Sequence, residues 1–314
     1  MKTIAYKEFG NAAVLQTINE TKPAPQAGQV LVKVKAVSIN PLDWKIRKGE
    51  MKLMSGSKFP KHTGTDFSGI IEDVGAMVQN LQKGDEVFGI VKNNMKEGAL
   101  GEYAAVPATH VWKKPNEVSF EQAAAIPTVG FAAVMALQKM RKVTADSRIL
   151  INGASGGFGM FLLQLLKFKG ATTTAVVGTH ALAAAKAWGA TTVIDYKKED
   201  VLTMGIEYDF VVDLSGRMGF QNARRIMKSE SVFINPIPNP VDILTNPIKN
   251  LFRSKKNIVL LSAPSAQYID ELLNAIKKGL KIEVSKVFPF AQSREAYEYA
   301  ERGGAIGKVV IEAG

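Results

Sequence analysis

The chain has 314 residues, 46% of them hydrophobic, and this length suits two domains of ordinary size better than one small core. It contains no cysteine, which excludes disulfides and thiolate metal sites, and the wide spacing of its three histidines (His62, His110 and His180) disfavours a zinc enzyme. The net charge of +11 is compatible with an anionic ligand, a nucleic acid, an acidic membrane surface or a solvated basic surface.

The start of the chain, MKTIAYKEFG, interleaves charges where a signal peptide needs an uninterrupted apolar segment. No apolar run reaches the ~20 residues that span a bilayer. We therefore expect a soluble protein located in the cytoplasm.

Residues 1–118 have the pattern of β-structure. The stretch 29–37, QVLVKVKAV, alternates with a period of two, and glycines and prolines punctuate the rest of the region. We expect a β-rich domain with long loops.

From about residue 120 the pattern changes to strands that alternate with helices. Strands are predicted at 148–152, 172–177, 192–194, 209–214, 231–235 and 257–262, and helices at 157–169, 180–188 and 218–227. Mostly apolar strands in such an alternation predict a parallel sheet covered on both faces, and hence an α/β fold. We expect the proline-rich stretch 236–256 to be a loop that walls the substrate pocket or contacts a second subunit.

The turn between the first strand and the first helix of this series is rich in glycine, since residues 151–160 read INGASGGFGM. Compared with the pattern G-x-G-x-x-G, Ala154 replaces the first glycine, and Gly156 and Gly159 supply the other two. Strand, glycine turn and helix in this order predict a pyrophosphate site, because backbone N–H groups and a helix N-terminus attract phosphate. A glycine-rich turn without a ligand is the alternative.

The next strand bears on the choice of cofactor. An NAD site usually ends this strand with an acid, about 20 residues past the turn, that binds the ribose 2′-hydroxyl. Here the strand leads into Gly178, Thr179 and His180, and the next acid is Asp195. Thr179 can donate to a 2′-phosphate and His180 can carry a compensating charge, so the sequence favours NADP(H) over NAD(H).

With these residues placed, the chain resembles the medium-chain dehydrogenase/reductase superfamily, in its zinc-free quinone oxidoreductase branch. The similarity extends over nearly the whole length and includes chloroplast-envelope quinone oxidoreductase homologues and alkenal/enone reductases. It rests on SINPLDWKIRKG (38–49), GTDFSGIIEDVG (64–75), KGDEVFG (83–89), the 154–159 turn and GKVV (307–310).

The resemblance implies a GroES-like domain of residues 1–118, completed by 265–314, and a Rossmann domain of residues 119–264, with the active-site cleft between them. Zinc-dependent relatives carry a ligand Cys where Asn40 stands and a His-Glu pair where Thr65 and Asp66 stand. We therefore expect no catalytic metal. Dimers are usual in this family, so a homodimer is expected.

Hydride transfer to an activated acceptor, a quinone or an α,β-unsaturated carbonyl compound, requires a donor for the oxygen on which negative charge develops. We expect Lys45 to supply this electrostatic role, with Asn40 as a neutral donor beside it. Two alternatives remain: Lys45 binds the ribose or phosphate of the cofactor, or it is a solvated lysine in a basic run. Asp43 and Asp66 are expected to be structural.

The resemblance also implies a set of cofactor contacts at the carboxyl ends of the predicted strands. They are Thr128 and Val129 at the nicotinamide end, Ser155, Gly156, Gly157 and Phe158 at the pyrophosphate, Gly178, Thr179 and His180 at the 2′-phosphate, Tyr196 at the adenosine phosphate or adenine, and Leu214, Ser215, Ser262, Ala263 and Pro264 near the nicotinamide.

The leading hypothesis is therefore an NADP(H)-dependent, zinc-free reductase of quinones or enones. A second is a regulatory protein that binds the cofactor with little turnover and contacts nucleic acid or a membrane surface. No amphipathic basic helix stands out in the sequence to support the second.

Overall fold

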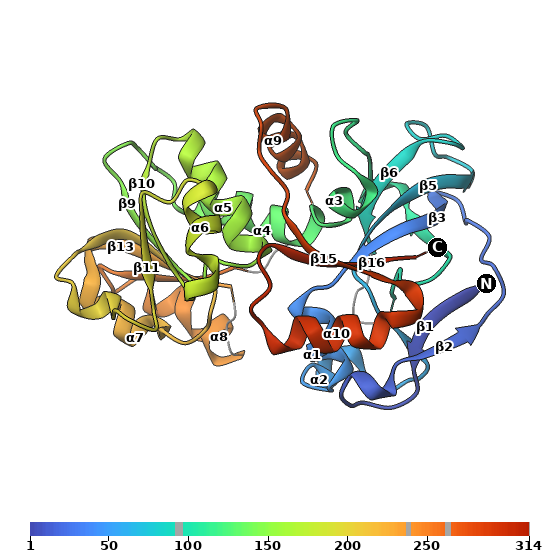
Figure 1. The fold of residues 1–314 in the computed structure, drawn as a ribbon, viewed down its shortest axis with the longest axis horizontal. Coiled ribbons are helices and arrows are strands. Elements are labelled where there is room, and N and C mark those ends of the chain that lie inside the picture. Colours follow the sequence, from blue (N-terminus) through green and yellow to red (C-terminus); the bar gives the residue numbers. More distant parts are fainter. Residues whose placement is uncertain (92–96, 237–239, 261–264, 314) are drawn as a thin grey trace. The chain divides into compact units, whose positions relative to one another are not determined.

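The structure, a computed structural model, describes residues 1–91, 97–236, 240–260 and 265–313. The chain divides into two compact units (Figure 1). Unit 1 comprises residues 1–128 and 284–314, and unit 2 comprises residues 129–283. Both boundaries lie later in the chain than the predicted ones.

Local packing explains the two shifts. The short helix α3 (Phe120–Ala124) contacts the main sheet of unit 1, and the Ser68 hydroxyl donates a 2.6 Å hydrogen bond to the Phe120 carbonyl. At the other boundary, the Gln164 side chain donates to the Lys281 carbonyl and accepts from the Lys281 N–H, both at 2.8 Å. Residues 119–128 therefore belong to unit 1, and residues 265–283 to unit 2.

Unit 1 contains two β-sheets. The strands are β1 (Lys2–Tyr6), β2 (Gln16–Asn19), β3 (Gln29–Ser38), β4 (Lys61–His62), β5 (Asp66–Val74), β6 (Glu86–Ile90), β7 (Tyr103–Pro107), β8 (Val111–Lys113), β15 (Val284–Pro289) and β16 (Lys308–Glu312). The small sheet has the order β2-β1-β4, and the large one β15-β16-β3-β5-β6-β8, with β7 also paired to β3. In Figure 1 the red strand β16 accordingly runs beside the blue strand β3.

The core of unit 1 follows from the period-two pattern of β3. Val30, Val32 and Val34 are fully buried on one face, and they join a hydrophobic cluster with Phe67 from the neighbouring strand β5. In the described part of the unit, helices α1 (Pro41–Arg47), α2 (Lys52–Ser55) and α10 (Ser293–Arg302) accompany α3.

Unit 2 is built on a six-stranded parallel sheet. Its strands are β9 (Arg148–Asn152), β10 (Thr172–Val177), β11 (Thr192–Asp195), β12 (Tyr208–Asp213), β13 (Met227–Asn235) and β14 (Lys256–Val259). The order β11-β10-β9-β12-β13-β14 places the first strand in the middle, so successive strands run outward in both directions from it. This is a doubly wound order, in agreement with the Rossmann domain that the resemblance implied, and its switch point lies at the carboxyl ends of β9 and β12.

The helices between these strands are α5 (Gly157–Phe168), α6 (Leu182–Ala187), α7 (Gly219–Ala223) and α8 (Pro240–Lys249); α4 (Pro127–Lys139) precedes β9 and α9 (Ala266–Lys277) follows β14. Helix α8 corrects the sequence analysis, which expected a loop across 236–256. A proline at the first helical position is tolerated because its missing N–H has no intrahelical partner there, and Pro247 interrupts the pattern without ending the helix. None of the helices in the described ranges is both long and apolar enough to cross a membrane.

Candidate active site

The glycine turn of unit 2 joins β9 directly to α5, as the sequence predicted. Gly156 is the N-cap of α5 and has extended backbone angles (φ −85°, ψ 180°), so the helix starts at Gly157. The first N–H groups of a helix have no carbonyl partner within it and carry the positive end of the helix dipole. Ser155, Gly156 and Phe158 are half-buried, so this positive end faces a partly open surface.

The two glycines of this turn differ in their surroundings. A Cβ atom on Gly159 would lie 2.2 Å from the Ala154 carbonyl oxygen, so only glycine allows α5 to approach the turn this closely. A Cβ atom on Gly156 would meet no atom within 4 Å. Gly159 is thus required by packing, whereas the space before Gly156 can accept the phosphates of a dinucleotide.

The loop that follows β12 lies against the glycine turn. Asn152, at the end of β9, donates from its side-chain amide to Asp213 and to the Ser215 hydroxyl, both at 2.9 Å. The second oxygen of Asp213 accepts from the N–H groups of Met218 and Gly219 at 2.9 and 3.0 Å. These bonds hold the ends of the two central strands together, and they place the predicted contacts Leu214 and Ser215 at the switch point.

An acid lies beside the predicted 2′-phosphate site, although it is distant in sequence. Val177 and Asp195 are paired residues of the parallel strands β10 and β11, and the Thr179 hydroxyl donates to Asp195 at 2.6 Å. This hydrogen bond lowers the pKa of Asp195, which is buried and ionised at neutral pH. Strand β10 itself ends without an acid, as predicted, but Asp195 of the neighbouring strand β11 lies beside its end, and the Thr179 hydroxyl already donates to it.

Other predicted contacts surround the same strand end. Gly178 is buried, and a Cβ atom on it would lie 3.0 Å from the His180 ring and 3.3 Å from the Tyr196 ring. Tyr196 is 54% exposed, and His180 is also exposed. Both rings can thus reach a ligand above this edge of the sheet.

Unit 1 holds a buried polar cluster made of Asn40, Asp43, Thr65, Asp66, Thr128 and Lys308. Three of its members come from adjacent strands: Lys308 opens β16, Asn40 follows β3, and Asp66 opens β5. Because β3 is antiparallel to both neighbours, its end lies beside the start of each of them. The sheet order therefore brings these three side chains together.

The Asn40 amide bridges a cation and a carboxylate. Its oxygen accepts from the Lys308 ammonium at 2.6 Å, and its nitrogen donates to Asp66 at 3.0 Å. An ammonium only donates and an ionised carboxylate only accepts, so these partners determine the orientation of the amide. All three side chains are at least 96% buried. Both ends of the Asn40 amide are thus already hydrogen-bonded within the protein rather than directed at a ligand.

Asp66 also holds the first turn of α4. One of its oxygens accepts from the Thr128 hydroxyl at 2.6 Å and the other from the Thr128 N–H at 3.1 Å. A carboxylate at a helix N-terminus is stabilised by the helix dipole. Since the Thr128 hydroxyl already donates to Asp66, it can only accept a hydrogen bond from a ligand. Its neighbour Val129 is half-buried in the same turn.

Burial shifts the titration of the charged members of the cluster. It raises the pKa of Asp43 to about 6, against hydrogen bonds from the Thr65 hydroxyl at 2.6 Å and the Asn40 N–H at 2.8 Å. It also raises the pKa of Asp66, and it lowers the pKa of Lys308, in both cases opposed by their mutual attraction. Asp43 thus closes the N-terminus of α1, the structural role that was expected of it.

Lys45 lies two residues after Asp43 in α1 and differs from these buried groups. It is half-buried, and its ammonium has no hydrogen-bond or ion-pair partner among the described residues. Of the charged and polar residues predicted to act in catalysis, Lys45 is therefore the one left available to a ligand, whereas Asn40 is enclosed. The roles of both in catalysis stay predictions.

Sequence reasoning missed one member of the cluster and made three predictions that lie outside the described residues. Lys308 was noted only as part of a family motif, although a lysine at the start of an apolar strand could have indicated a buried partner. The predicted contacts Ser262, Ala263 and Pro264 fall in the range 261–264, which the structure does not describe. No cluster of His, Cys, Asp or Glu in the described ranges could hold a metal ion.

A doubly wound parallel sheet with a glycine turn at its switch point defines a dinucleotide-binding protein. Comparison with known proteins narrows this class. The family model for the alcohol dehydrogenase GroES-like domain matches residues 26–116, and that for the zinc-binding dehydrogenase matches residues 188–311.

Two curated relatives align with nearly all of the chain. The chloroplast envelope quinone oxidoreductase homolog of Arabidopsis thaliana is 31% identical, with 99% of this chain and 98% of that protein covered. The chloroplastic NADPH-dependent alkenal/one oxidoreductase of the same plant is 30% identical, with 99% and 79% covered.

Two solved structures resemble the fold closely. The quinone oxidoreductase from Coxiella burnetii is 31% identical with a TM-score of 0.90, and 99% of each chain is covered. The Escherichia coli quinone oxidoreductase, solved in complex with NADPH, is 25% identical with a TM-score of 0.85, and 99% of this chain and 100% of that one are covered. The chain therefore belongs to the medium-chain dehydrogenase/reductase family, in its quinone oxidoreductase branch, and it is an oxidoreductase with a nicotinamide cofactor.

Proposed function

We propose that the chain is an NADP(H)-dependent, zinc-independent reductase that transfers hydride to quinones or to α,β-unsaturated carbonyl compounds. The observation that carries this proposal is the unpaired, half-buried ammonium of Lys45 on the unit that also buries Asn40 and Asp66. Where related enzymes place a catalytic metal, this chain has an amide and a carboxylate already bound to each other. We therefore assign the cation for the acceptor oxygen to a side chain, that of Lys45.

The residues of unit 2 fit a bound dinucleotide. The open space at Gly156 and the start of α5 suit the pyrophosphate, and Asn152 and Asp213 fix the loop beside it. The cofactor supplies a hydride to the electron-poor carbon of the acceptor. Lys45 stabilises the negative charge that develops on the conjugated oxygen, and the product takes a proton from solvent.

The choice of NADP(H) rests on the edge of the sheet at β10 and β11. Asp195 is buried, and its oxygens already accept from the Thr179 hydroxyl and the Lys197 N–H. The exposed cations beside it are Lys197 and Lys198, which together with His180 suit a 2′-phosphate. The NADPH-dependent alkenal/one oxidoreductase and the NADPH complex of the Escherichia coli quinone oxidoreductase support this choice.

A titration and a substrate panel test the proposal. The dissociation constants of NADPH and NADH are measured on the purified protein, and turnover is then followed by NADPH absorbance with a naphthoquinone, an alkenal and an alkyl enone. We expect tighter binding of NADPH, saturable turnover of at least one acceptor, and no effect of a metal chelator. Tighter binding of NADH would overturn the cofactor assignment. NADPH binding without turnover of any acceptor would favour the regulatory alternative. A cytoplasmic homodimer stays a prediction.

A further inference from the structure

A cavity of about 340 Å³ lies within unit 2, between the sheet and the helices α7 and α8. Strand alternation determines which side chains of the sheet line it. Asn257 of β14 pairs in register with Phe233 of β13, and Asn235 lies two residues after Phe233, so the three side chains point to the same face of the parallel sheet. Residues of α7 and α8 close the cavity on the other side. Its volume is within the range of small-molecule sites.

This cavity differs in position from the predicted dinucleotide site. It lies over β12, β13 and β14, whereas the predicted pyrophosphate and 2′-phosphate contacts lie at the ends of β9, β10 and β11. None of the cofactor contacts predicted within the described ranges lines it. The two regions adjoin at Asp213, whose oxygens already accept five hydrogen bonds, from the Asn152 amide, the Ser215 hydroxyl and the N–H groups of Gly216, Met218 and Gly219.

Two buried amide groups of the cavity wall lack hydrogen-bond partners. Asn246 of α8 is 97% buried and Asn257 of β14 is 95% buried. The side-chain nitrogen of Asn246 and the side-chain oxygen of Asn257 have no partner among the described residues. The nitrogen can only donate and the oxygen can only accept. Since buried polar atoms are nearly always hydrogen-bonded, this pair indicates a ligand group that both accepts and donates.

Helix α8 turns its polar face toward the cavity. Asp242, Asn246 and Lys249 follow one another at intervals of four and three residues, which puts them on one face of the helix, and all three line the cavity. Leu244 and Ile248, on the outer face, are 75% and 63% exposed. A helix that only covered the sheet would have its apolar face inward. The orientation of α8 is the reverse, and it supplies the cavity with polar groups.

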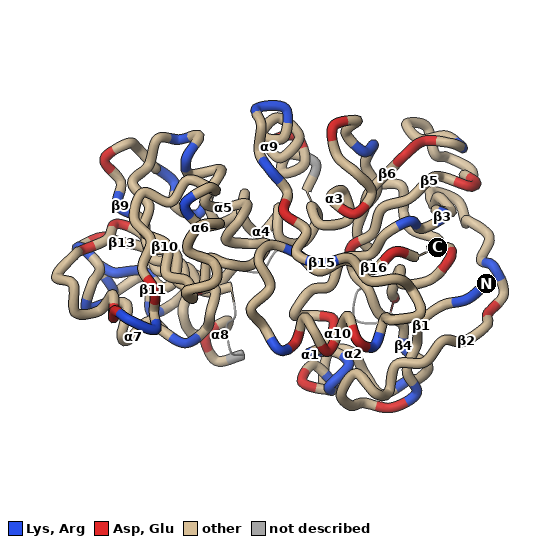
Figure 2. Tube along the Cα trace, in the orientation of Figure 1, with Lys and Arg blue, Asp and Glu red and all other residues tan. Residues whose placement is uncertain are grey.

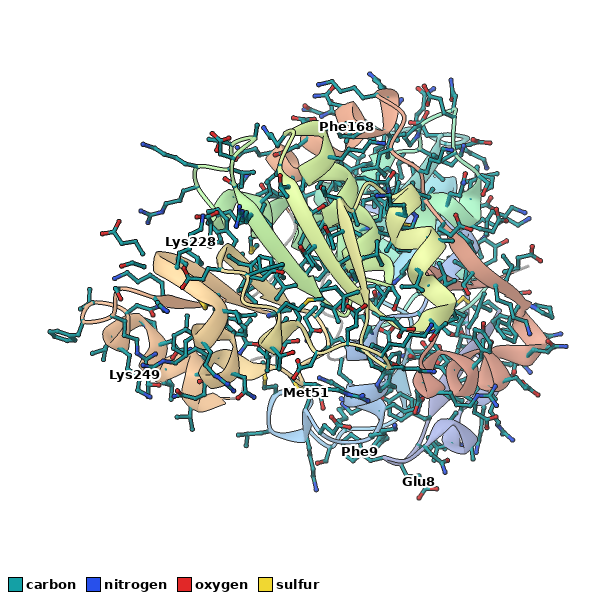
Figure 3. The ribbon with its side chains drawn as sticks, turned by 60° about the vertical axis from the view of Figure 1, so that its left-hand side comes forward. Glu8, Phe9, Met51, Phe168, Lys228 and Lys249 are labelled. Atoms are coloured by element: carbon teal, nitrogen blue, oxygen red, sulfur yellow. The ribbon has the colours of Figure 1, made fainter. Side chains whose placement is uncertain are left out.

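Two cations lie at the outer end of the cavity. Lys249 is exposed, and its ammonium has no hydrogen-bond or ion-pair partner among the described residues. Arg253 is half-buried, and its guanidinium lies 5.2 Å from the centre of the Phe220 ring. The acid of this helix face, Asp242, is seven residues before Lys249 and so about 10 Å away along the axis. Figure 2 shows blue segments around α7 and α8, and Figure 3 labels Lys249.

We propose that this cavity binds a small hydroxylated organic anion, of the class of sugar phosphates and sugar acids. The phosphate or carboxylate of the ligand pairs with Lys249 and Arg253. Its hydroxyl groups accept from Asn246 and donate to Asn257, and its carbon atoms pack against the ring of Phe220. An inorganic anion would satisfy the cations but not the amides, and an uncharged polyol would satisfy the amides but not the cations.

Calorimetric titration of the full chain tests the proposal without any acceptor. The probes are ribose 5-phosphate, gluconate, inorganic phosphate and ribose, each with and without saturating NADPH. We expect ribose 5-phosphate or gluconate to bind at least tenfold more tightly than inorganic phosphate and ribose, whether or not NADPH is present. The tighter of the two identifies the anionic group as phosphate or carboxylate.

Matched variants assign the binding to this cavity. Lys249→Ala/Arg253→Ala should weaken binding of the tighter probe by about tenfold or more, and Lys277→Ala/Lys278→Ala, which removes two exposed cations at the end of α9, should leave it unchanged.

Asn246→Leu replaces the buried amide by an apolar group of similar size. It should also weaken binding of the tighter probe, because the donor to the ligand is lost. Without the probe it should raise the Tm by about 2–4 °C, because it removes an unpaired buried donor. Thermal denaturation measures this shift and establishes that every variant is folded.

Three outcomes would overturn the proposal. The first is the absence of binding by both ribose 5-phosphate and gluconate. The second is binding that NADPH displaces and that Lys249→Ala/Arg253→Ala leaves unchanged, which would place the anion in the cofactor site. The third is equal affinity for ribose 5-phosphate and inorganic phosphate, which would reduce the cavity to a nonspecific anion site.

Discussion

The Lys308 ammonium reaches the Asp66 carboxylate through the Asn40 amide rather than by direct contact. Hydrogen bonds of 2.6 Å and 3.0 Å join the three side chains, all within the core of unit 1. In such a chain of bonds the charges at the two ends polarise the amide between them. The pair is thus stabilised across a neutral residue, and each end depends on the other.

Replacement of Lys308 by Met should destabilise the protein strongly. Asp66 would remain buried without its cation, and the loss of one partner from a buried ionic pair typically costs about 3–5 kcal/mol. Urea denaturation measures the change, with Lys278→Met, at the exposed C-cap of α9, as a control that should stay within about 0.5 kcal/mol of wild type. The double variant Lys308→Met/Asp66→Asn should recover part of the loss. Equal stability of Lys308→Met and the control would contradict this account.

Asp43 should make stability fall between pH 4 and pH 6. Its pKa is raised from 3.8 to about 6 in the folded state, so in this window the folded chain binds a proton that the unfolded chain has released. The stabilisation is complete below pH 4 and is lost as the pH rises through 6. Relative to wild type, Asp43→Asn should therefore gain up to about 3 kcal/mol in unfolding free energy from pH 4 to pH 7. A difference between the two proteins that does not change with pH would refute the shift.

Asp195→Asn should increase the preference for NADPH over NADH. Removal of a negative charge near the 2′-phosphate strengthens NADPH binding, by about threefold to tenfold at low salt, and leaves NADH binding unchanged or weaker. Fluorescence titration of both cofactors gives the ratio, and Asp270→Asn, an exposed acid of α9, is the control. If both cofactors bind the variant as they bind the wild type, the 2′-phosphate does not lie at this strand end.

The two glycines of the turn should respond differently to alanine. Gly159→Ala pushes a Cβ atom into the Ala154 carbonyl and should lower the unfolding free energy by about 2 kcal/mol or more. Gly156→Ala has room and compatible backbone angles, so it should fold normally but bind NADPH at least several-fold more weakly. Thermal denaturation and cofactor titration on both variants distinguish the two effects. A stable Gly159→Ala protein would disprove the packing argument.

Lys45→Met should lower kcat/KM by at least about tenfold, the scale expected when an electrostatic donor to the developing charge is lost. Lys48→Met, three residues along the same basic run, is the matched control and should not change the kinetics. A loss confined to the KM for NADPH would assign Lys45 to the cofactor instead, and unchanged kinetics would remove it from the mechanism.

Regular patterns made most of the fold predictable. The predicted bounds of β9 and β10 agree with the structure, because buried parallel strands are short apolar runs between turns. Helix α8 was missed for the opposite reason, since prolines and an outward apolar face hide a helix from arguments that assume its apolar face is buried.

The contacts between the site residues were less predictable from the sequence than the identity of those residues. The link between Thr179 and Asp195, and that between Asn40 and Lys308, join residues far apart in sequence. Both depend on which strands lie side by side, and periodicity does not specify strand order. The sequence indicates where strands end, but only the structure shows which strand ends lie next to each other in the sheet.

Strand β16 is the last strand to be synthesised, although it does not lie at an edge of its sheet. This strand lies between β15 and β3 in the sheet, yet it emerges from the ribosome after every residue of unit 2. Until then the Asn40 amide after β3 and the Asp66 carboxylate at the start of β5 lack the Lys308 ammonium. Unit 2 is contiguous in sequence and can fold during synthesis, whereas unit 1 cannot complete its sheet until β16 has been synthesised. Until that point, part of the edge of β3 has no neighbouring strand.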